Sequence, residues 1–185
     1  MKKQRLIASV LGLALFAYVG LAAYALASQG AEALLVCADK GGLKIPFSRD
    51  LCRQYLLSMR GSAQDIEALH RGIGASFVVQ GESSEREREE LLKYLVGKGL
   101  DVNRIDAHQL TPLHNAVIAN AEDEVRMLLN HGARPDVRDT KFGLTPLELA
   151  LRLQREAKAP AGRQAVVSLL EDARPAMSES RSGAR

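Results

Sequence analysis

His114 is the first side chain to consider as a catalytic group, because it lies in the stretch LTPLHNAVIANAEDEV with acidic residues a short distance downstream. A histidine oriented by a carboxylate is a common general base, and Asp123 or Glu124 could supply that carboxylate. The opposing interpretation is that the whole stretch is scaffold. The pattern of the surrounding sequence decides between the two.

His70 offers a second combination of this kind, because Asp65 and Glu67 lie just before it. It defines an alternative in which the chain is an uncharacterised hydrolase. His108 and His131 are isolated, and the sequence has no H-x-x-x-H or H-E-x-x-H spacing, so we predict no metal site. The segment RGIGAS lacks the further glycine and the GK[ST] of phosphate-binding loops, so it is interpreted as a loop and no cofactor is predicted.

The composition predicts a helical body with no general affinity for nucleic acid. The chain has 185 residues, no Trp and 4% aromatic residues, so its core must be built mainly from Leu, Val and Ala. Of the 25 basic residues, Lys2, Lys3 and Arg5 precede the first acidic residue, Glu32, and the other 22 balance 22 acidic residues. A neutral body of this kind disfavours binding to phosphate backbones.

Residues 1–28 are predicted to be a membrane anchor or a signal sequence. Leu6–Ala27 has 22 residues without a charge, and a helix of that length spans about 33 Å, enough to cross a hydrocarbon core of roughly 30 Å. Ala25 and Ala27 form an A-x-A motif, so cleavage is the alternative. The basic N-terminus predicts a body outside the cytoplasm, either anchored in the inner membrane and facing the periplasm or released into it.

Cys37 and Cys52 lie 15 residues apart, ahead of the repeated part of the chain. An oxidising compartment such as the periplasm allows them to form a disulfide, which we predict. A redox pair or half of a metal site would favour C-x-x-C spacing or a nearby histidine, and neither is present. The two cysteines are therefore expected to staple the segment that contains them.

The sequence repeats with a period of 33 to 34 residues. LLKYLVGKGLDVNRID at 91–106 matches VRMLLNHGARPDVRD at 125–139, which aligns Gly99 with Gly132, and LTPLHNA at Leu110 matches LTPLELA at Leu144. A period of this length is typical of stacked helical repeats. Thr111 can cap a helix that begins with Pro112, and Asn120 tolerates a left-handed turn at its end. Val125, Leu128 and Leu129 are predicted to form the inward side of the helix that follows.

The segments TPLHNA, EVRMLLNHGA and GLDVN resemble the ankyrin repeat family, over about 85–173. The resemblance implies that His114 hydrogen-bonds the turns between repeats instead of acting in catalysis. It also implies an all-α solenoid of about three units that is not an enzyme. The last unit departs from the pattern, because Glu148 replaces the motif histidine and EAKAPAGR is inserted.

The expected organisation has four segments. After the N-terminal segment 1–28 come a disulfide-containing helical cap or degenerate repeat at 29–82, the ankyrin repeats at 83–173 and a disordered tail at 174–185. In the second segment, 50–60 and 66–79 have apolar helical patterns, and Ser62 with Asp65 predicts the start of a helix that ends near Arg71. Ser84 with Glu87 predicts the next helix start.

The resemblance implies that a protein partner binds the turns between repeats, the fingers, and the adjoining helix. The residues concerned are Arg104, Ile105, His108 and Leu110 in the first finger, Arg138, Lys141, Phe142 and Leu144 in the second, and Asn115, Ile118 and Ala119 on the helix. Exposed apolar residues beside Arg suit an interface hot spot, with Phe142 as the main anchor. The alternative is that Ile105, Leu110 and Leu144 pack locally under the fingers.

The predicted function is non-catalytic binding of a protein partner in the periplasm. Small exported bacterial ankyrin proteins are similar to immunity proteins that inhibit toxic effectors directed at the envelope, such as lipases. The resemblance also suggests the alternative of an accessory protein that supports a periplasmic enzyme such as a catalase. The sequence assigns no oligomeric state.

Overall fold

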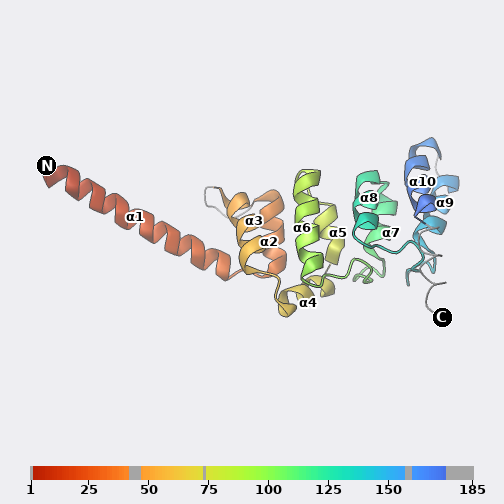
Figure 1. Ribbon diagram of the computed structural model, residues 1–185, viewed down its shortest axis with the longest axis horizontal. Helices are drawn as coiled ribbons and strands as arrows, with labels where there is room; N and C mark the ends of the chain where they lie inside the picture. The colour runs from red at the N-terminus through yellow and green to blue at the C-terminus, as the bar shows by residue number, and fades with distance from the viewer. Residues whose placement is uncertain (1, 42–46, 73, 157–159, 174–185) are drawn as a thin grey trace. The chain divides into compact units, whose positions relative to one another are not determined.

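The computed structural model describes the chain except for residues 1, 42–46, 73, 157–159 and 174–185 (Figure 1). All regular elements in the described ranges are helical, as predicted. The chain divides into two compact units, Met1–Arg60 and Gly61–Arg185, so the division falls inside the segment 29–82 that the sequence treats as one. The predicted disordered tail, 174–185, lies outside the described residues.

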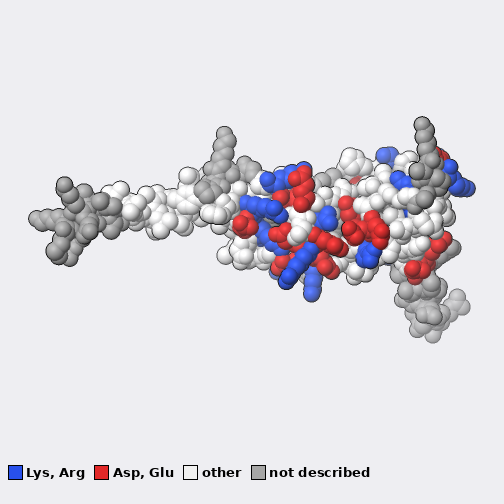
Figure 2. Space-filling view, turned by 90° about the horizontal axis from the view of Figure 1, so that it is seen from above, with Lys and Arg blue, Asp and Glu red and all other residues white. Residues whose placement is uncertain are grey.

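The first unit begins with the long helix α1 (Lys2–Ala27). Its segment Val10–Ala27 has a mean hydropathy of 2.1, and 11% of it is buried, so by length and composition it can cross a membrane. Figure 2 shows no charged side chain on this part of the helix. The N-terminal apolar helix predicted from the sequence is therefore present.

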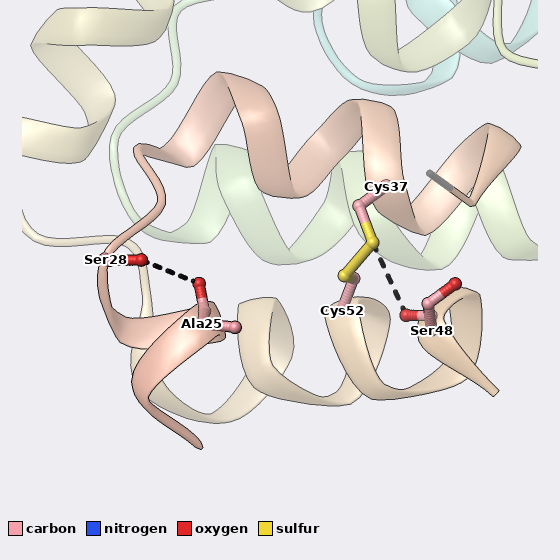
Figure 3. Close-up of a disulfide and its surroundings, with 5 residues drawn as sticks. All are labelled: Ala25, Ser28, Cys37, Ser48 and Cys52. Atoms are coloured by element: carbon pink, nitrogen blue, oxygen red, sulfur yellow. Dashed lines mark hydrogen bonds between the residues drawn. A yellow bond between two sulfur atoms is a disulfide. The ribbon is translucent and has the colours of Figure 1, made fainter. Parts of the chain in front are cut away.

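Helices α2 (Ala31–Lys40) and α3 (Ser48–Met59) pack against each other in the first unit. A disulfide joins Cys37 of α2 to Cys52 of α3, with 2.00 Å between the Sγ atoms and 5.9 Å between the Cα atoms (Figure 3). Cys52 has no exposed surface, and Leu56, one turn later, is 1% exposed. The apolar pattern at 50–60 is thus a helix whose inner side holds the disulfide.

The second unit begins with helix α4 (Ala63–Arg71), which starts and ends where the sequence predicts. The Ser62 hydroxyl accepts from the Asp65 N–H at 3.2 Å, and the Asp65 carboxylate accepts from the Ser62 N–H at 3.1 Å. This reciprocal capping satisfies N–H groups that the first turn of a helix leaves unpaired. Ser84 and Glu87 form the same arrangement at the start of α6 (Glu85–Gly97).

The interpretation of RGIGAS as a loop is wrong for its second half. Residues 74–76 form the first turn of the short helix α5 (Gly74–Val79), which buries Ala75, Val78 and Val79. Burial of these small and branched side chains against α6 and α7 stabilises a helix too short to be stable alone.

Three helix pairs follow one another along the second unit (Figure 1). Within it α5, α7 and α9 form one row of contacts, and each is paired with the helix that follows it along the chain. The pairs are α5 with α6, α7 (Pro112–Ala119) with α8 (Glu122–Asn130), and α9 (Pro146–Glu156) with α10 (Gln164–Asp172). The 3-10 turn η1 (Pro160–Arg163) directly precedes α10.

The middle pair follows the predicted signals closely. The Thr111 hydroxyl caps α7, Pro112 occupies its first turn, and Asn120 ends it in the left-handed conformation at φ 56°. In α8 Val125 and Leu128 are fully buried, as expected. The third buried position is Met127 instead of the predicted Leu129, which is half-buried, because the buried side of α8 is rotated toward Met127.

Two arginines donate to carbonyl groups at the carboxyl ends of α7 and α5, the first between neighbouring helix pairs and the second within a pair. Arg163, in the inserted segment of the last repeat, donates to the carbonyl oxygens of Val117 at 2.6 Å and Ile118 at 3.2 Å. Arg88 of α6 donates to the carbonyl oxygen of Val79, the last residue of α5, at 2.9 Å. A cation at a helix C-terminus satisfies free carbonyls and complements the helix dipole.

Candidate protein-binding surface

The first finger connects α6 to α7 and is organised by the buried carboxylate of Asp106. Its Oδ1 atom accepts from the N–H groups of His108 at 2.8 Å and Leu110 at 3.1 Å. The Asp106 N–H donates to the Leu110 carbonyl at 2.9 Å, which closes the turn. Because these backbone groups are paired internally, the tip at residues 107–109 is held in one conformation with its side chains exposed.

The second finger repeats this arrangement around Asp139, which is 3% exposed. Its carboxylate accepts from the N–H groups of Phe142 and Leu144, and its own N–H donates to the Leu144 carbonyl at 3.0 Å. Gly143 takes a left-handed conformation at φ 70°, where the first finger places Gln109 at φ 67°. The two fingers are therefore the same structure with one residue inserted.

Hydrogen bonds of the backbone and of the Asn103 side chain connect the two fingers into a continuous surface. The Thr140 N–H donates to the carbonyl of Gln109 at 3.2 Å, which joins the tips. Nearer the base, Asn103 donates from Nδ2 to the Gly132 carbonyl at 3.0 Å and accepts from the Arg134 N–H at 2.7 Å. A partner would therefore meet both tips as one rigid body.

His114 is fully buried and connects the middle repeat to the last. Its Nδ1 lies 2.7 Å from the Thr111 hydroxyl, and its Nε2 lies 3.0 Å from the Leu144 carbonyl and 3.4 Å from Asp139. The Leu144 carbonyl can only accept, so Nε2 carries the proton and Nδ1 accepts from Thr111. Burial lowers the pKa of His114, although the Leu144 carbonyl and Asp139 act in the opposite direction. The lowered pKa favours the neutral form of the ring, and its contacts hold the scaffold.

The acidic residues considered as partners for His114 lie elsewhere, in the first turn of α8. Burial raises the pKa of Glu124, against the effect of the nearby Arg88. Asp139, a residue of the following finger, is the carboxylate beside His114. The stretch that contains His114 is scaffold, because the ring is inaccessible and its contacts are structural.

His70 is also engaged in structural contacts. Its Nε2 accepts from the Asp101 N–H at 2.8 Å, and its Nδ1 lies 3.2 Å from Arg104 and 3.7 Å from Glu67. Both ring nitrogens therefore lie close to other groups of the chain. Among the residues that the structure describes, no group of His, Cys, Asp and Glu has the arrangement of a metal site.

Two of the predicted binding arginines form ion pairs within the chain. Arg104 donates to both carboxylate oxygens of Glu67 at 3.2 Å, and this hydrogen bonding lowers the pKa of Glu67. Arg138 donates to both oxygens of Glu148 at 2.7 and 2.9 Å, and to the Gly143 carbonyl at 2.8 Å. Both arginines therefore brace the bases of the fingers, although their side chains are partly exposed.

Asn115, another residue predicted to contact the partner, is half-buried. Its Nδ2 donates to Ser76 of α5 at 2.9 Å and to Asp106 at 2.7 Å. Leu110 is 3% exposed, so its inclusion in the binding surface is wrong and the alternative of local packing holds for it. Ile105 and Leu144 are half-buried.

The outward-facing part of the predicted surface is smaller and lies at the finger tips and on α7. Phe142 is 45% exposed and Ile118 is 42% exposed. The ammonium group of Lys141 lies 5.4 Å from the centre of the Phe142 ring, a cation–π distance. His108 and Ala119 are exposed as well. We call Lys141, Phe142, His108 and Ile118 the tip surface.

Sequence reasoning missed a hollow of about 380 Å³ between the second finger and the last helix pair. Its lining includes Pro135, Arg138, Glu148 and Leu151. Glu148 lies there because it forms a capping box with Thr145, whose N–H donates to the carboxylate at 2.9 Å. That hydrogen bond and Arg138 lower the pKa of Glu148. The sequence does contain the signal, since T-x-x-E is a capping-box pattern.

Residues 82–173 match the family model for ankyrin repeats, in three copies. This part of the chain is therefore an ankyrin-repeat domain, as the repeat period and the three helix pairs had indicated. The structure adds α5, which begins before the matched residues and completes the first pair. Ankyrin repeats are generally non-catalytic modules for protein–protein interaction.

Among curated proteins the chain is similar to much longer ones. It is 33% identical over 78 residues to the mouse ankyrin repeat and SOCS box protein 16, covering 42% of this chain and 17% of that protein. It is 43% identical over 67 residues to the human 2-5A-dependent ribonuclease, a match that covers 36% of this chain and 9% of the ribonuclease. The Arabidopsis thaliana putative E3 ubiquitin-protein ligase XBAT35 is 35% identical over 100 residues, covering 49% and 21%. The matched region is at most about a fifth of each of these relatives.

Proposed function

We propose that the repeats bind a protein partner through the tip surface. The observation that carries this proposal is the contrast between the finger bases, where Arg104 and Arg138 are paired within the chain, and the tips, where Lys141 and Phe142 face outward. An aromatic ring beside a cation on a rigid support loses little conformational freedom on binding. The cation also gives the surface a preference for a partner with a nearby carboxylate.

We further propose that α1 is retained in a bacterial inner membrane and that the repeats face the periplasm. The apolar span, the basic residues before it and the disulfide support this location. The alternative of cleavage after Ala27 would release the same domain into the periplasm. A reporter enzyme that is active only in the periplasm, fused after Arg185, tests the location, and activity of a cytoplasmic reporter at that position would contradict it.

The biological role that we propose is inhibition of a toxic effector that acts in the envelope, such as a lipase. Support comes from the combination of an export segment, a small binding domain and a disulfide. Expression of the chain should protect cells from the cognate toxin directed to the periplasm. The opposite result, an increase in the activity or stress survival of a periplasmic enzyme such as a catalase, would identify a helper instead.

Binding through the tip surface is tested by cross-linking the intact protein in envelope membranes and measuring recovery of the cross-linked partner. Phe142→Ala and Lys141→Glu should each reduce partner affinity at least about tenfold, as expected for a hot spot. Val36→Ala is the matched control, because it removes an exposed apolar side chain outside the repeats and should leave affinity unchanged. Equal recovery with all three variants would place the interface elsewhere. Arg138→Glu is a poorer probe, since it also breaks the pair with Glu148.

A further inference from the structure

Helix α3 carries a row of outward side chains that the repeats do not use. Phe47 precedes the helix, and Leu51, Tyr55 and Met59 follow at intervals of four residues, so they lie along one side. Phe47 is 78% exposed, Leu51 36% and Met59 71%, and Tyr55 is half-buried. We call these four residues the α3 stripe. The side of α3 that packs on α2 is a different one, which holds Cys52.

The carboxyl end of the α3 stripe lies beside the end of the candidate membrane span. Arg60, directly after α3, donates from Nη2 to the carbonyl oxygens of Ala27, at 3.4 Å, and Gln29. Figure 3 shows the end of α1, marked by Ala25, next to the helix that carries Cys52. Because the span ends at Ala27, insertion of α1 brings this end of α3 to the depth of the lipid headgroups.

The side chains at this level have the chemistry of a membrane interface. Tyr24, in the last turn of α1, is 73% exposed. The Arg60 guanidinium lies 5.8 Å from the centre of the Tyr55 ring, so a cation and an aromatic ring meet where the two helices meet. Tyrosine is enriched at membrane–water boundaries, and arginine can extend to the headgroups while its methylene groups contact apolar surface.

We propose that the α3 stripe rests in the headgroup region of the bilayer that α1 enters. Exposed apolar side chains along one side of a helix bind such a surface by burying apolar area at the boundary of the acyl chains. The occupant is lipid, because the chain itself brings the bilayer to the end of the stripe. The inference rests on the proposed retention of α1 and holds for either face of the membrane.

The absence of Trp from the sequence permits a direct test. The full chain with Phe47→Trp is reconstituted in vesicles of phosphatidylethanolamine and phosphatidylglycerol. A fraction of the lipid molecules carries bromine near the headgroup end of the acyl chains. We expect the Trp emission to shift to shorter wavelength and to be quenched by the brominated lipid. Phe142→Trp, at the finger tip, is the matched control. Its Trp emission should stay at the wavelength of a side chain exposed to water, and the brominated lipid should not quench it.

Flotation of the vesicles, measured on the same samples, separates this inference from the anchoring of α1. Protein that floats but shows equal, unquenched emission from Phe47→Trp and Phe142→Trp would overturn the inference and leave the anchor intact. A shift to shorter wavelength without quenching by brominated lipid would also overturn it, since protein would then cover the stripe. Failure to float would remove both proposals. Met59→Trp repeats the test if the first variant loses its helical content or its disulfide.

Discussion

The segments that start α7 and α9 are nearly identical, TPLH and TPLE, with the Thr directly before each helix. The fourth residue of each segment is used in an opposite way. His114 accepts a hydrogen bond from the Thr111 hydroxyl at Nδ1 and donates one from Nε2 to the Leu144 carbonyl of the next finger. Glu148 turns back to the Thr145 N–H of its own cap. One side chain therefore connects two repeats, whereas the other completes a single repeat.

The difference shows how a repeat sequence distinguishes an inner unit from an outer one. An imidazole can accept with one nitrogen and donate with the other, so it can satisfy its own helix cap and a neighbouring carbonyl together. A carboxylate only accepts, so it suits a helix start that has free N–H groups and a nearby Arg138. The hollow beside Glu148 marks the side of α9 that no other described helix pair covers.

The comparison predicts that His114→Ala is the most damaging of the substitutions considered. It leaves the Leu144 carbonyl without the imidazole donor and opens a cavity in a fully buried place. We expect a loss of about 3 kcal/mol in the free energy of unfolding. Urea denaturation of the wild type and the variant, followed by circular dichroism, measures the difference.

Glu148→Ala is the matched control for that substitution, because it truncates the equivalent residue of the last repeat. Its carboxylate is exposed and contacts only its own cap and finger, so we expect a much smaller effect. Equal destabilisation by the two variants would contradict the distinction between a connecting and a closing side chain.

The pH dependence of stability sharpens the same comparison. Burial lowers the pKa of His114 below its ordinary value of about 6.5, so the unfolded chain takes up a proton at a higher pH than the native chain does. Stability must therefore fall as the pH drops below about 6.5, by up to roughly 1.4 kcal/mol per pH unit until the native histidine also titrates.

His114→Gln is the control for this titration, since its amide can still donate to the Leu144 carbonyl but does not ionise. The difference in unfolding free energy between wild type and variant should narrow from about pH 7 to about pH 5.5 as the wild type loses stability. A difference that is independent of pH would mean that the native imidazole titrates like that of the unfolded chain.

The sequence could predict the repeat frame because its signals are local. Thr111, Pro112 and Asn120 each determine backbone geometry within one helix, and the structure uses them as predicted. The functional surface was harder to predict, because exposure depends on contacts between distant residues. Arg104 pairs with Glu67, 37 residues away, and neither the repeat period nor the helix pattern indicates that pair.

The first unit shows the same limit. Its cysteines and its apolar helical pattern could be read from the sequence, but the direction of the α3 stripe could not. Positions 47, 51, 55 and 59 have the spacing of an inward stripe, and so does the pair formed by Cys52 and Leu56. The packing of α2 on α3 selects the second set as the buried one, and only the three-dimensional contacts reveal that selection.

The smallest effect is predicted for Glu148→His, which places the motif residue of the inner repeat in the last one. The new imidazole can still interact with Thr145, but it has no following finger among the described residues to receive its second nitrogen, and it loses the pair with Arg138. We therefore expect the urea midpoint to fall by less than it does in Glu148→Ala. A higher midpoint would instead mean that the hollow beside α9 supplies a carbonyl acceptor, so that the last pair behaves as an inner one.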